Sequence, residues 1–207
     1  MKVLLLSCSP RGQASESNRL ARNIIGFLLE REPQATLIER VIGGGNIPHI
    51  DASYATALGS AQKSKAEISQ QGSFLLSEEL VQELESADTI VIGTPMHNFT
   101  VPSTLKAWID HIVRVRRTFD MGPEGRTGAL RDRPVFVAVS SGGSYSGEHA
   151  RQPDFLTPYL KAALGMIGLH DLTFFSVEGT GSAPDGLIEA RCKADRALQE
   201  YFSPIAA

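Results

Sequence analysis

The sequence predicts a doubly wound α/β fold built on one five-stranded parallel sheet. Short, continuous apolar runs at Lys2–Leu6, Thr89–Gly93 and Pro134–Ser140 are typical of strands buried on both faces of such a sheet. Between these runs, apolar residues recur at the three- and four-residue spacing of amphipathic helices. Because strand and helix alternate along the chain, we expect crossover connections and the strand order 2-1-3-4-5, with helices on both faces.

The other elements follow from the same two patterns. The first helix is indicated by apolar residues that share one face: Leu20, Ile24, Phe27 and Leu28. A strand at Thr36–Val41 and a helix over Leu75–Leu84 come next. A helix begins near Pro102, because its first turn accommodates proline, and extends to Val113. The last three elements are a helix, a strand and a helix, at Leu156–Met166, Leu172–Val177 and Pro184–Tyr201.

The segment Gly43–Gly72 has the weakest pattern. A glycine-rich start and a polar, alanine-rich continuation predict a loop and a loosely defined helix. Insertions of this length are usually functional or face a partner. We therefore expect one domain over residues 1–207, with an insertion at about 43–72.

Polar residues follow the first strand and lead into a helix. Hydroxyl groups at Ser9, Ser15 and Ser17, together with N–H groups at the helix N-terminus, suit a phosphate monoester without a lysine. A serine at this place also caps a helix, and the two roles are compatible. Neither a Walker loop nor a GxGxxG fingerprint is present, which argues against ATP and against a Rossmann dinucleotide site.

Two more strand ends carry ligand-binding patterns. The strand at Thr89–Gly93 leads into Thr94–Pro102, where Met96, His97, Asn98 and Phe99 offer polarizable, flat or hydrogen-bonding groups to a planar ring. The strand ending at Ser140 leads into a Gly/Ser-rich stretch, whose glycines allow backbone to approach a ligand closely. Ligands of open α/β sheets bind beyond the carboxyl ends of the strands, so these three segments predict one site.

In the order and spacing of these motifs, nearly the whole chain resembles the FMN-dependent NADH:quinone oxidoreductases of the azoreductase family, within the flavodoxin-like superfamily. The resemblance rests on SerProArgGlyGlnAlaSerGluSerAsnArgLeu (9–20), ProMetHisAsnPhe (95–99), ProSerThrLeuLysAlaTrpIleAspHis (102–111), ThrPhe (118–119), GlyProGluGly (122–125) and SerSerGlyGly (140–143). Further matches are LeuThrProTyrLeu (156–160), LeuGlyMetIleGlyLeu (164–169) and ValGluGlyThr (177–180).

The resemblance implies a flavodoxin-like fold, bound FMN and a ligand set in three parts. The phosphate contacts would be Ser9, Ser15, Glu16 and Ser17. The isoalloxazine contacts would be Met96, His97, Asn98 and Phe99. The ring edge would meet Ser140, Ser141, Gly142 and Gly143. It further implies NADH or NADPH as electron donor, a quinone or azo compound as acceptor, and a homodimer whose active site the insertion helps to close.

The sequence departs from the family pattern on the substrate side. His97 stands where many members have tyrosine, Ser141 where many have arginine, and the segment Phe119–Gly122 is shorter than usual. His97 either donates a hydrogen bond or proton to the acceptor or only stacks against the ring, because hydride chemistry belongs to the flavin. No other catalytic residue is identified, and the histidines lack metal-ligand spacing.

Composition narrows the class of protein. A net charge of −3 and a pI near 6.0 give no electrostatic case for nucleic acid. No apolar run approaches the length that spans a bilayer, and the N-terminal run is too short for a signal peptide. Two cysteines, Cys8 and Cys192, make no disulfide framework and indicate a reducing cytoplasm. Cys8 is either a reactive thiol or, by the stronger expectation, a small buried residue.

Two other protein classes and the role of one arginine cluster are weighed on the sequence alone. A flavodoxin-like electron carrier would bind FMN without a substrate pocket, but such carriers are usually strongly acidic. A receiver domain needs acidic residues at the first strand end, where this chain has Ser7–Ser9. The cluster of Arg114, Arg116 and Arg117 either meets a cofactor phosphate or forms a solvated helix end, and we favour the solvated end.

Overall fold

A computed structural model describes residues 1–59, 72–148, 150–181 and 183–203. Five parallel strands in this part of the chain form one sheet in the order β2-β1-β3-β6-β7, so the predicted order 2-1-3-4-5 is confirmed. The strands are β1 (Lys2–Ser7), β2 (Thr36–Val41), β3 (Thr89–Pro95), β6 (Val135–Ser140) and β7 (Leu172–Val177). The order reverses at β1 and β3, which places the strand ends that face a ligand next to each other.

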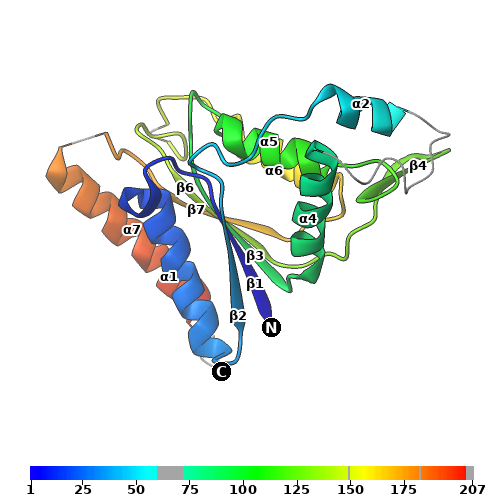
Figure 1. The fold of residues 1–207 in the computed structure, drawn as a ribbon. Helices are drawn as coiled ribbons and strands as arrows, with labels where there is room; N and C mark the ends of the chain where they lie inside the picture. The colour runs from blue at the N-terminus through cyan, green and yellow to red at the C-terminus, as the bar shows by residue number, and fades with distance from the viewer. Residues whose placement is uncertain (60–71, 149, 182, 204–207) are drawn as a thin grey trace.

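Helices cover both faces of the sheet (Figure 1). One face packs against α1 (Glu16–Arg31) and α7 (Pro184–Phe202). The other packs against α4 (Ser73–Ser86), α5 (Ser103–Ile112) and α6 (Leu156–Gly165). The strands point upward in Figure 1, so their carboxyl ends and the loops that follow lie at the top, away from the N-terminus.

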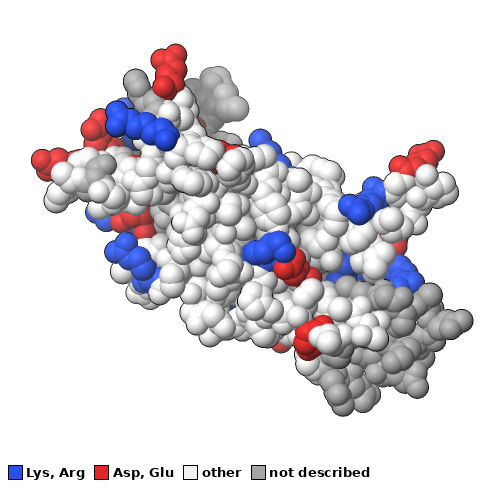
Figure 2. Space-filling model, turned by 90° about the horizontal axis from the view of Figure 1, so that it is seen from above, with Lys and Arg blue, Asp and Glu red and all other residues white. Residues whose placement is uncertain are grey.

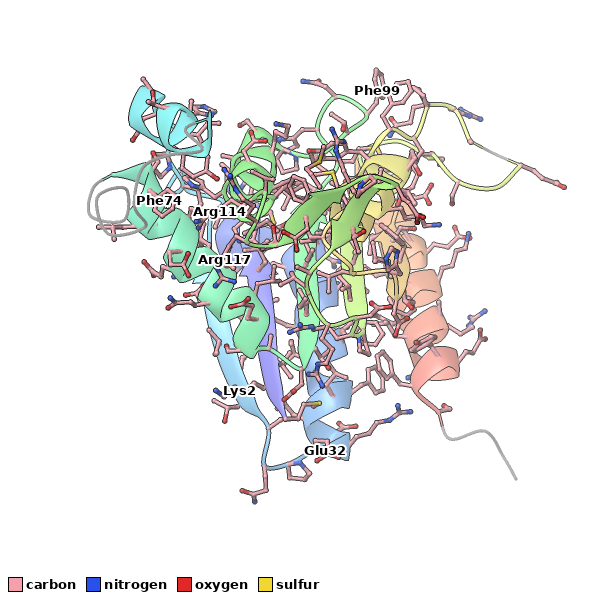
Figure 3. The ribbon with its side chains drawn as sticks, turned by 90° about the vertical axis from the view of Figure 1, so that its right-hand side faces the viewer. Lys2, Glu32, Phe74, Phe99, Arg114 and Arg117 are labelled. Carbon is pink, nitrogen blue, oxygen red and sulfur yellow. The ribbon has the colours of Figure 1, made fainter. Side chains whose placement is uncertain are left out.

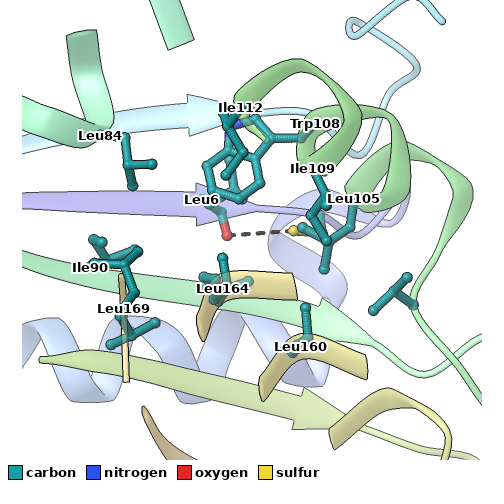
Figure 4. Packing of buried hydrophobic residues seen from close by; sticks show 14 of the residues in the cluster. Leu6, Leu84, Ile90, Leu105, Trp108, Ile109, Ile112, Leu160, Leu164 and Leu169 are labelled. Carbon is teal, nitrogen blue, oxygen red and sulfur yellow. Dashed lines mark hydrogen bonds between the residues drawn. The ribbon is translucent and has the colours of Figure 1, made fainter. Parts of the chain in front are cut away.

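Alternate residues of the buried strands enter different cores. Val3 and Leu5 of β1 pack on the α1 side, whereas Leu4 and Leu6 pack on the α5 side. Figure 4 shows the second of these cores, where Trp108 and the leucines of α5 and α6 meet the strands. Burial of each large apolar side chain is worth about 1.5–3 kcal/mol, so the two cores hold the strand ends in fixed positions.

The start of the insertion is anchored to the helical layer. The Asp51 carboxylate accepts hydrogen bonds from the Tyr54 N–H (2.7 Å) and the Ser73 hydroxyl (2.8 Å). The Tyr54 hydroxyl in turn donates to main-chain oxygens of Asp110 and His111 in α5. The predicted loop and helix correspond to residues 43–51 and α2 (Ala52–Gly59), and the rest of the predicted insertion, residues 60–71, lies outside the described part.

A small antiparallel hairpin, β4 (Phe119–Gly122) with β5 (Gly125–Gly128), was not predicted. Its base packs against the turn after α6, where a Cβ added to Gly128 would lie 2.2 Å from the Gly168 nitrogen. Because neither glycine has a side chain, the two main chains can lie in contact, which explains Gly168 in the motif at 164–169.

Candidate functional site

Three loops follow β1, β3 and β6 at the carboxyl edge of the sheet: the first loop (residues 8–15), the middle loop (96–102) and the third loop (141–147). Main-chain hydrogen bonds tie them together. The Cys8 N–H donates to the Gly93 oxygen (2.8 Å), and the Met96 N–H donates to the Ser140 oxygen (2.7 Å). The structure thus brings the three predicted segments to one place, as the parallel topology requires.

The first loop presents hydroxyl and N–H groups. Ser9, Ser15 and Ser17 are buried, and the Ser9 hydroxyl accepts from the Arg11 N–H (3.2 Å). Ser15 precedes α1, yet its hydroxyl makes no capping bond; instead it lies 2.8 Å from the Ser17 hydroxyl. The helical ladder of α1 starts with Arg19 N–H donating to the Ser15 oxygen (3.0 Å). The N–H groups of Glu16, Ser17 and Asn18 therefore have no acceptor within the helix.

The side chain of Glu16 is directed to α7. Its carboxylate pairs with Arg191 (Nε to Oε2, 2.9 Å) and with Arg19 (Nε to Oε2, 3.2 Å). These partners lower the pKa of Glu16, mainly through the Arg191 hydrogen bond, although burial opposes the shift. Glu16 is one of the four predicted phosphate contacts. Because its carboxylate is engaged by the two arginines, only its main-chain N–H group is free for a ligand at this helix end.

The middle loop makes a tight turn at Asn98 and Phe99. Both residues have positive φ (49° and 72°), and His97 and Thr100 exchange two main-chain hydrogen bonds across them (2.9 and 3.1 Å). A non-glycine residue with positive φ is uncommon, and a bulky one more so, so this turn is a strained feature of the kind that gathers at functional sites. It leaves the His97 and Asn98 side chains exposed and the Phe99 ring 44% exposed at the top of the molecule (Figure 3).

The third loop is fixed from two sides. Gln152 donates to the Ser141 hydroxyl (2.8 Å) and its Nε2 lies 3.2 Å from the Met96 sulfur, which joins the third loop to the middle loop. On the far side, the Glu178 carboxylate accepts from the Tyr145 and Ser146 N–H groups (2.8 and 3.2 Å). A Cβ added to Gly142 would meet no atom within 4 Å. The main chain of the third loop is therefore held in place, and the space beside Gly142 is open.

Ser140 and Ser141 are buried, and Ser141 points into the contact with Gln152. The position where many relatives of the resembled family carry arginine thus adds no positive charge here. Gln152 is a site residue that was not predicted from the sequence, because it lies in an irregular segment without a periodic pattern.

Figure 2 views the molecule from the side of these loops. Most of this surface is uncharged, although a basic and an acidic side chain lie side by side near its centre and other charged side chains lie toward its rim.

Arg116 of the arginine cluster is exposed, as a solvated helix end requires, but the expectation is wrong for Arg114. Its side chain is buried, pairs with Glu78 of α4 (Nη1 to Oε2, 3.0 Å) and lies over the Phe74 ring at 4.2 Å. Arg117 pairs with Glu78 (2.9 Å) and Glu85 (2.5 Å) of the same helix. Figure 3 shows Arg114 and Arg117 beside α4, away from Phe99, so these two arginines join α4 to the end of α5.

Cys8 is fully buried, and its sulfur lies 3.8 Å from the Leu6 oxygen (Figure 4). Burial raises the pKa of the Cys8 thiol, which keeps it protonated. The expectation of a small buried residue is confirmed. Among the described residues, no group of three His, Cys, Asp or Glu side chains is placed to hold a metal, and none of the described helices is long and apolar enough to cross a membrane.

A parallel five-stranded sheet of order 2-1-3-4-5, with its loops gathered at the carboxyl edge, defines a flavodoxin-like protein. A family model described as a flavodoxin-like fold matches residues 1–202. The FMN-dependent NADH:quinone oxidoreductase 4 of Pseudomonas fluorescens is 45% identical over 205 residues, which is 98% of this chain and 97% of the relative. The FMN-dependent NADH:quinone oxidoreductase 5 of Burkholderia lata is 45% identical over 88% of this chain and 86% of the relative. The chain belongs to the family of FMN-dependent NADH:quinone oxidoreductases, as the sequence motifs predicted.

Solved structures agree. An FMN-dependent NADH-azoreductase from Bacillus anthracis, in complex with FMN, is 26% identical with a TM-score of 0.77, and the match covers 98% of this chain and 99% of that one. A second azoreductase structure from Bacillus anthracis has a TM-score of 0.82 over 98% of both chains at 22% identity, which supports the fold. Because these relatives are named as oxidoreductases, the electron-carrier and receiver hypotheses gain no support.

Proposed function

We propose that this chain is an FMN-dependent NADH:quinone oxidoreductase that reduces quinones or azo compounds. The observation that carries the proposal is the junction of the three loops at one edge of the sheet, in a chain 45% identical to oxidoreductases named for FMN, NADH and quinone. The residues at this edge fit FMN in two respects, its phosphate and its ring.

The phosphate fits the first loop. The Ser15 and Ser17 hydroxyls are hydrogen-bonded to each other. Because a hydroxyl hydrogen rotates freely, both hydroxyls can instead donate to an anion. The N–H groups in the first turn of α1 add donors and the positive end of a helix dipole. Ser9 completes this set. Such a site binds a phosphate dianion with neutral donors.

The ring fits between the other two loops. We propose that Met96, His97, Asn98 and Phe99 of the middle loop contact the isoalloxazine. We propose that Ser140, Ser141, Gly142 and Gly143 lie beside the edge of the ring. Fixed main-chain groups at 142–143 can donate and accept in the ring plane, and the open space beside Gly142 leaves room for the edge of the ring. Met96 is held by Gln152, so its sulfur is positioned before any ligand arrives.

FMN, when bound, supplies two-electron transfer from NADH to a quinone or azo acceptor. This chain's residues orient the reactants above the ring: the exposed Phe99 and His97 stand at the surface where a planar donor or acceptor would stack. One surface can serve both reactants in turn. The donor would then leave before the acceptor enters.

The direct test is the absorbance spectrum of the purified protein. We expect flavin bands from bound FMN that bleach when NADH is added under anaerobic conditions and return when a quinone is added. Protein that is reconstituted with FMN and shows no bleaching by NADH or NADPH would contradict the proposal. The same experiment ranks the two donors by their bleaching rates.

The order of binding has its own test. We expect parallel lines in double-reciprocal plots when NADH is varied at several fixed quinone concentrations, because each reactant leaves before the other binds. Lines that intersect would indicate a ternary complex and overturn the single-surface arrangement.

We further propose a homodimer in the cytoplasm. Two large apolar side chains near the site, Phe99 and Phe155, are 44% and 59% exposed, and the Phe155 N–H donates to the Phe99 oxygen (3.0 Å). A second subunit would cover them, and the insertion would help close the pocket.

Sedimentation is expected to give a dimer, and removal of residues 55–71 should lower turnover more than FMN affinity. A fully active monomer would contradict this.

A further inference from the structure

Glu16 raises an electrostatic problem that the proposed FMN site must solve. It is the first residue of α1, so its carboxylate belongs to the same helical turn whose N–H groups we assign to the phosphate. A carboxylate and a phosphate dianion within one turn repel each other, and the repulsion is largest where water is excluded. The carboxylate is only 12% exposed, so solvent screens it poorly.

Two arginines from different helices take up this charge. Arg191 of α7 reaches Glu16 with two nitrogens, Nε at 2.9 Å from Oε2 and Nη2 close to Oε1, which is the forked geometry that suits a carboxylate. Arg19, one turn along α1, donates to the same Oε2 (3.2 Å). Hydrogen bonding to Arg191 is the main cause of the lowered pKa of Glu16, so the carboxylate is ionised at neutral pH.

A second acid completes the cluster. Asp195, one turn after Arg191 on α7, accepts from Arg19 (Nη1 at 2.9 and 3.0 Å) and from Asn23 (3.0 Å). The four charged groups balance, and they join the first half of α1 to the middle of α7. Arg19 divides its charge between two carboxylates, which leaves Arg191 as the cation that is committed to Glu16.

We propose that Arg191 is a positioning residue for the cofactor phosphate: it turns the Glu16 carboxylate toward α7 and cancels its charge, so that the N-terminus of α1 can accept a dianion. This inference rests on the proposed FMN site. It assigns to α7, a helix that provides none of the loop residues, control over the affinity for the phosphate but not for the ring.

The test compares FMN with riboflavin, which lacks the phosphate, by titrating apoprotein and following flavin fluorescence. For Arg191→Met we expect FMN affinity to fall on the order of tenfold, since an uncompensated carboxylate then faces the phosphate, while riboflavin affinity stays within about twofold. Arg196→Met on the same helix is the matched control: Arg196 is exposed, the charge change is identical, and FMN affinity should hold.

The double variant Glu16→Gln with Arg191→Met decides the cause. If the charge of Glu16 is responsible, removing it restores most of the FMN affinity. Equal weakening of FMN and riboflavin in Arg191→Met, or a double variant as weak as Arg191→Met, would overturn the inference and indicate a structural role. Wild-type protein that binds no FMN would instead overturn the proposed function itself.

Discussion

The main chain of Gly43 touches the main chain of Ser9: a Cβ added to Gly43 would lie 2.0 Å from the Ser9 carbonyl oxygen. The N–H of Gly43 also donates to the Ser7 oxygen (3.1 Å), directly beyond the last pair of β1 and β2. Gly43, the first residue of the predicted insertion, thus packs directly against the first loop. Any side chain at this position has to displace backbone, because the atoms it would meet belong to Ser9 and Cys8.

Gly43→Ala is therefore expected to displace the first loop. Overpacking of this kind costs roughly 1–3 kcal/mol, which in a chain of this size lowers Tm by about 2–12 °C. The free energy of FMN binding should weaken by at least as much as the free energy of unfolding, because the displaced residue is Ser9. Thermal unfolding with and without FMN measures both. Gly26→Ala is the control: a Cβ at Gly26 in α1 meets nothing within 4 Å, so this change should stabilise slightly. Equal Tm values for the two variants would show that the loop adapts.

The paired hydroxyls of Ser15 and Ser17 give a second prediction. Hydrogen bonds to a charged group are worth about 1.5–3 kcal/mol each, so Ser15→Ala with Ser17→Ala should weaken FMN by on the order of 10²-fold or more. Riboflavin should be affected far less. Isothermal titration of both ligands makes the comparison, and Ser86→Ala on the exposed end of α4 should change neither. Equal weakening of both ligands would remove the phosphate from this loop.

The ion pair between Arg114 and Glu78 predicts how stability depends on pH. The Arg117 hydrogen bond, with Arg114 assisting, lowers the pKa of Glu78 from 4.5 to about 2. A depressed carboxyl pKa stabilises the folded state above the unfolded value, and this stability is lost as pH falls from about 4.5 toward about 2. The carboxylate is 32% exposed, so screening reduces the contribution to about 1–2 kcal/mol.

Glu78→Gln should accordingly lower the free energy of unfolding at pH 7 by about 1–3 kcal/mol, because Arg114 stays buried without its carboxylate. The difference from wild type should shrink below pH 4. Urea unfolding at several pH values measures it, and Glu30→Gln, an exposed glutamate of α1, should change little. A difference that is as large near pH 2 as at pH 7 would mean that charge is not the cause.

The sequence predicted the parallel sheet well because its strands are buried on both faces. A continuous apolar run as short as Thr89–Gly93, bounded by polar residues, is typical of a central strand and too short for a buried helix. The hairpin at 119–128 was missed for the opposite reason: its residues are mostly exposed, and it is fixed by the contact between Gly128 and Gly168, which are 40 positions apart. The burial of Arg114 was also invisible, since its partner Glu78 is set by the packing of α4 on α5.

The candidate site divides in the same way. Ser9, Ser15 and Ser17 were predicted as phosphate contacts because hydroxyls after a strand and before a helix form a local pattern, and the structure places them at the end of β1 and the start of α1. The turn of Glu16 toward Arg191, and the contact of Gln152 with Ser141 and Met96, join segments that only the tertiary fold brings together. Local sequence thus located the loops, whereas the direction of individual side chains depended on distant partners.

The last prediction concerns His97. Its main chain is fixed by the exchange of hydrogen bonds with Thr100, but its imidazole is exposed beside the Phe99 turn, where an acceptor would stack. Its ring nitrogens can donate a hydrogen bond or a proton to the acceptor, which would assist the reaction with quinone.

His97→Phe separates donation from stacking, because phenylalanine keeps a flat ring and removes the donor. We expect the oxidative half-reaction with quinone or azo dye to slow by on the order of 10²-fold, while reduction by NADH changes little. Stopped-flow absorbance follows the two half-reactions separately. His170→Phe, at the opposite edge of the sheet before β7, should leave both unchanged. Wild-type rates in both half-reactions of His97→Phe would reduce the role of His97 to packing against the ring.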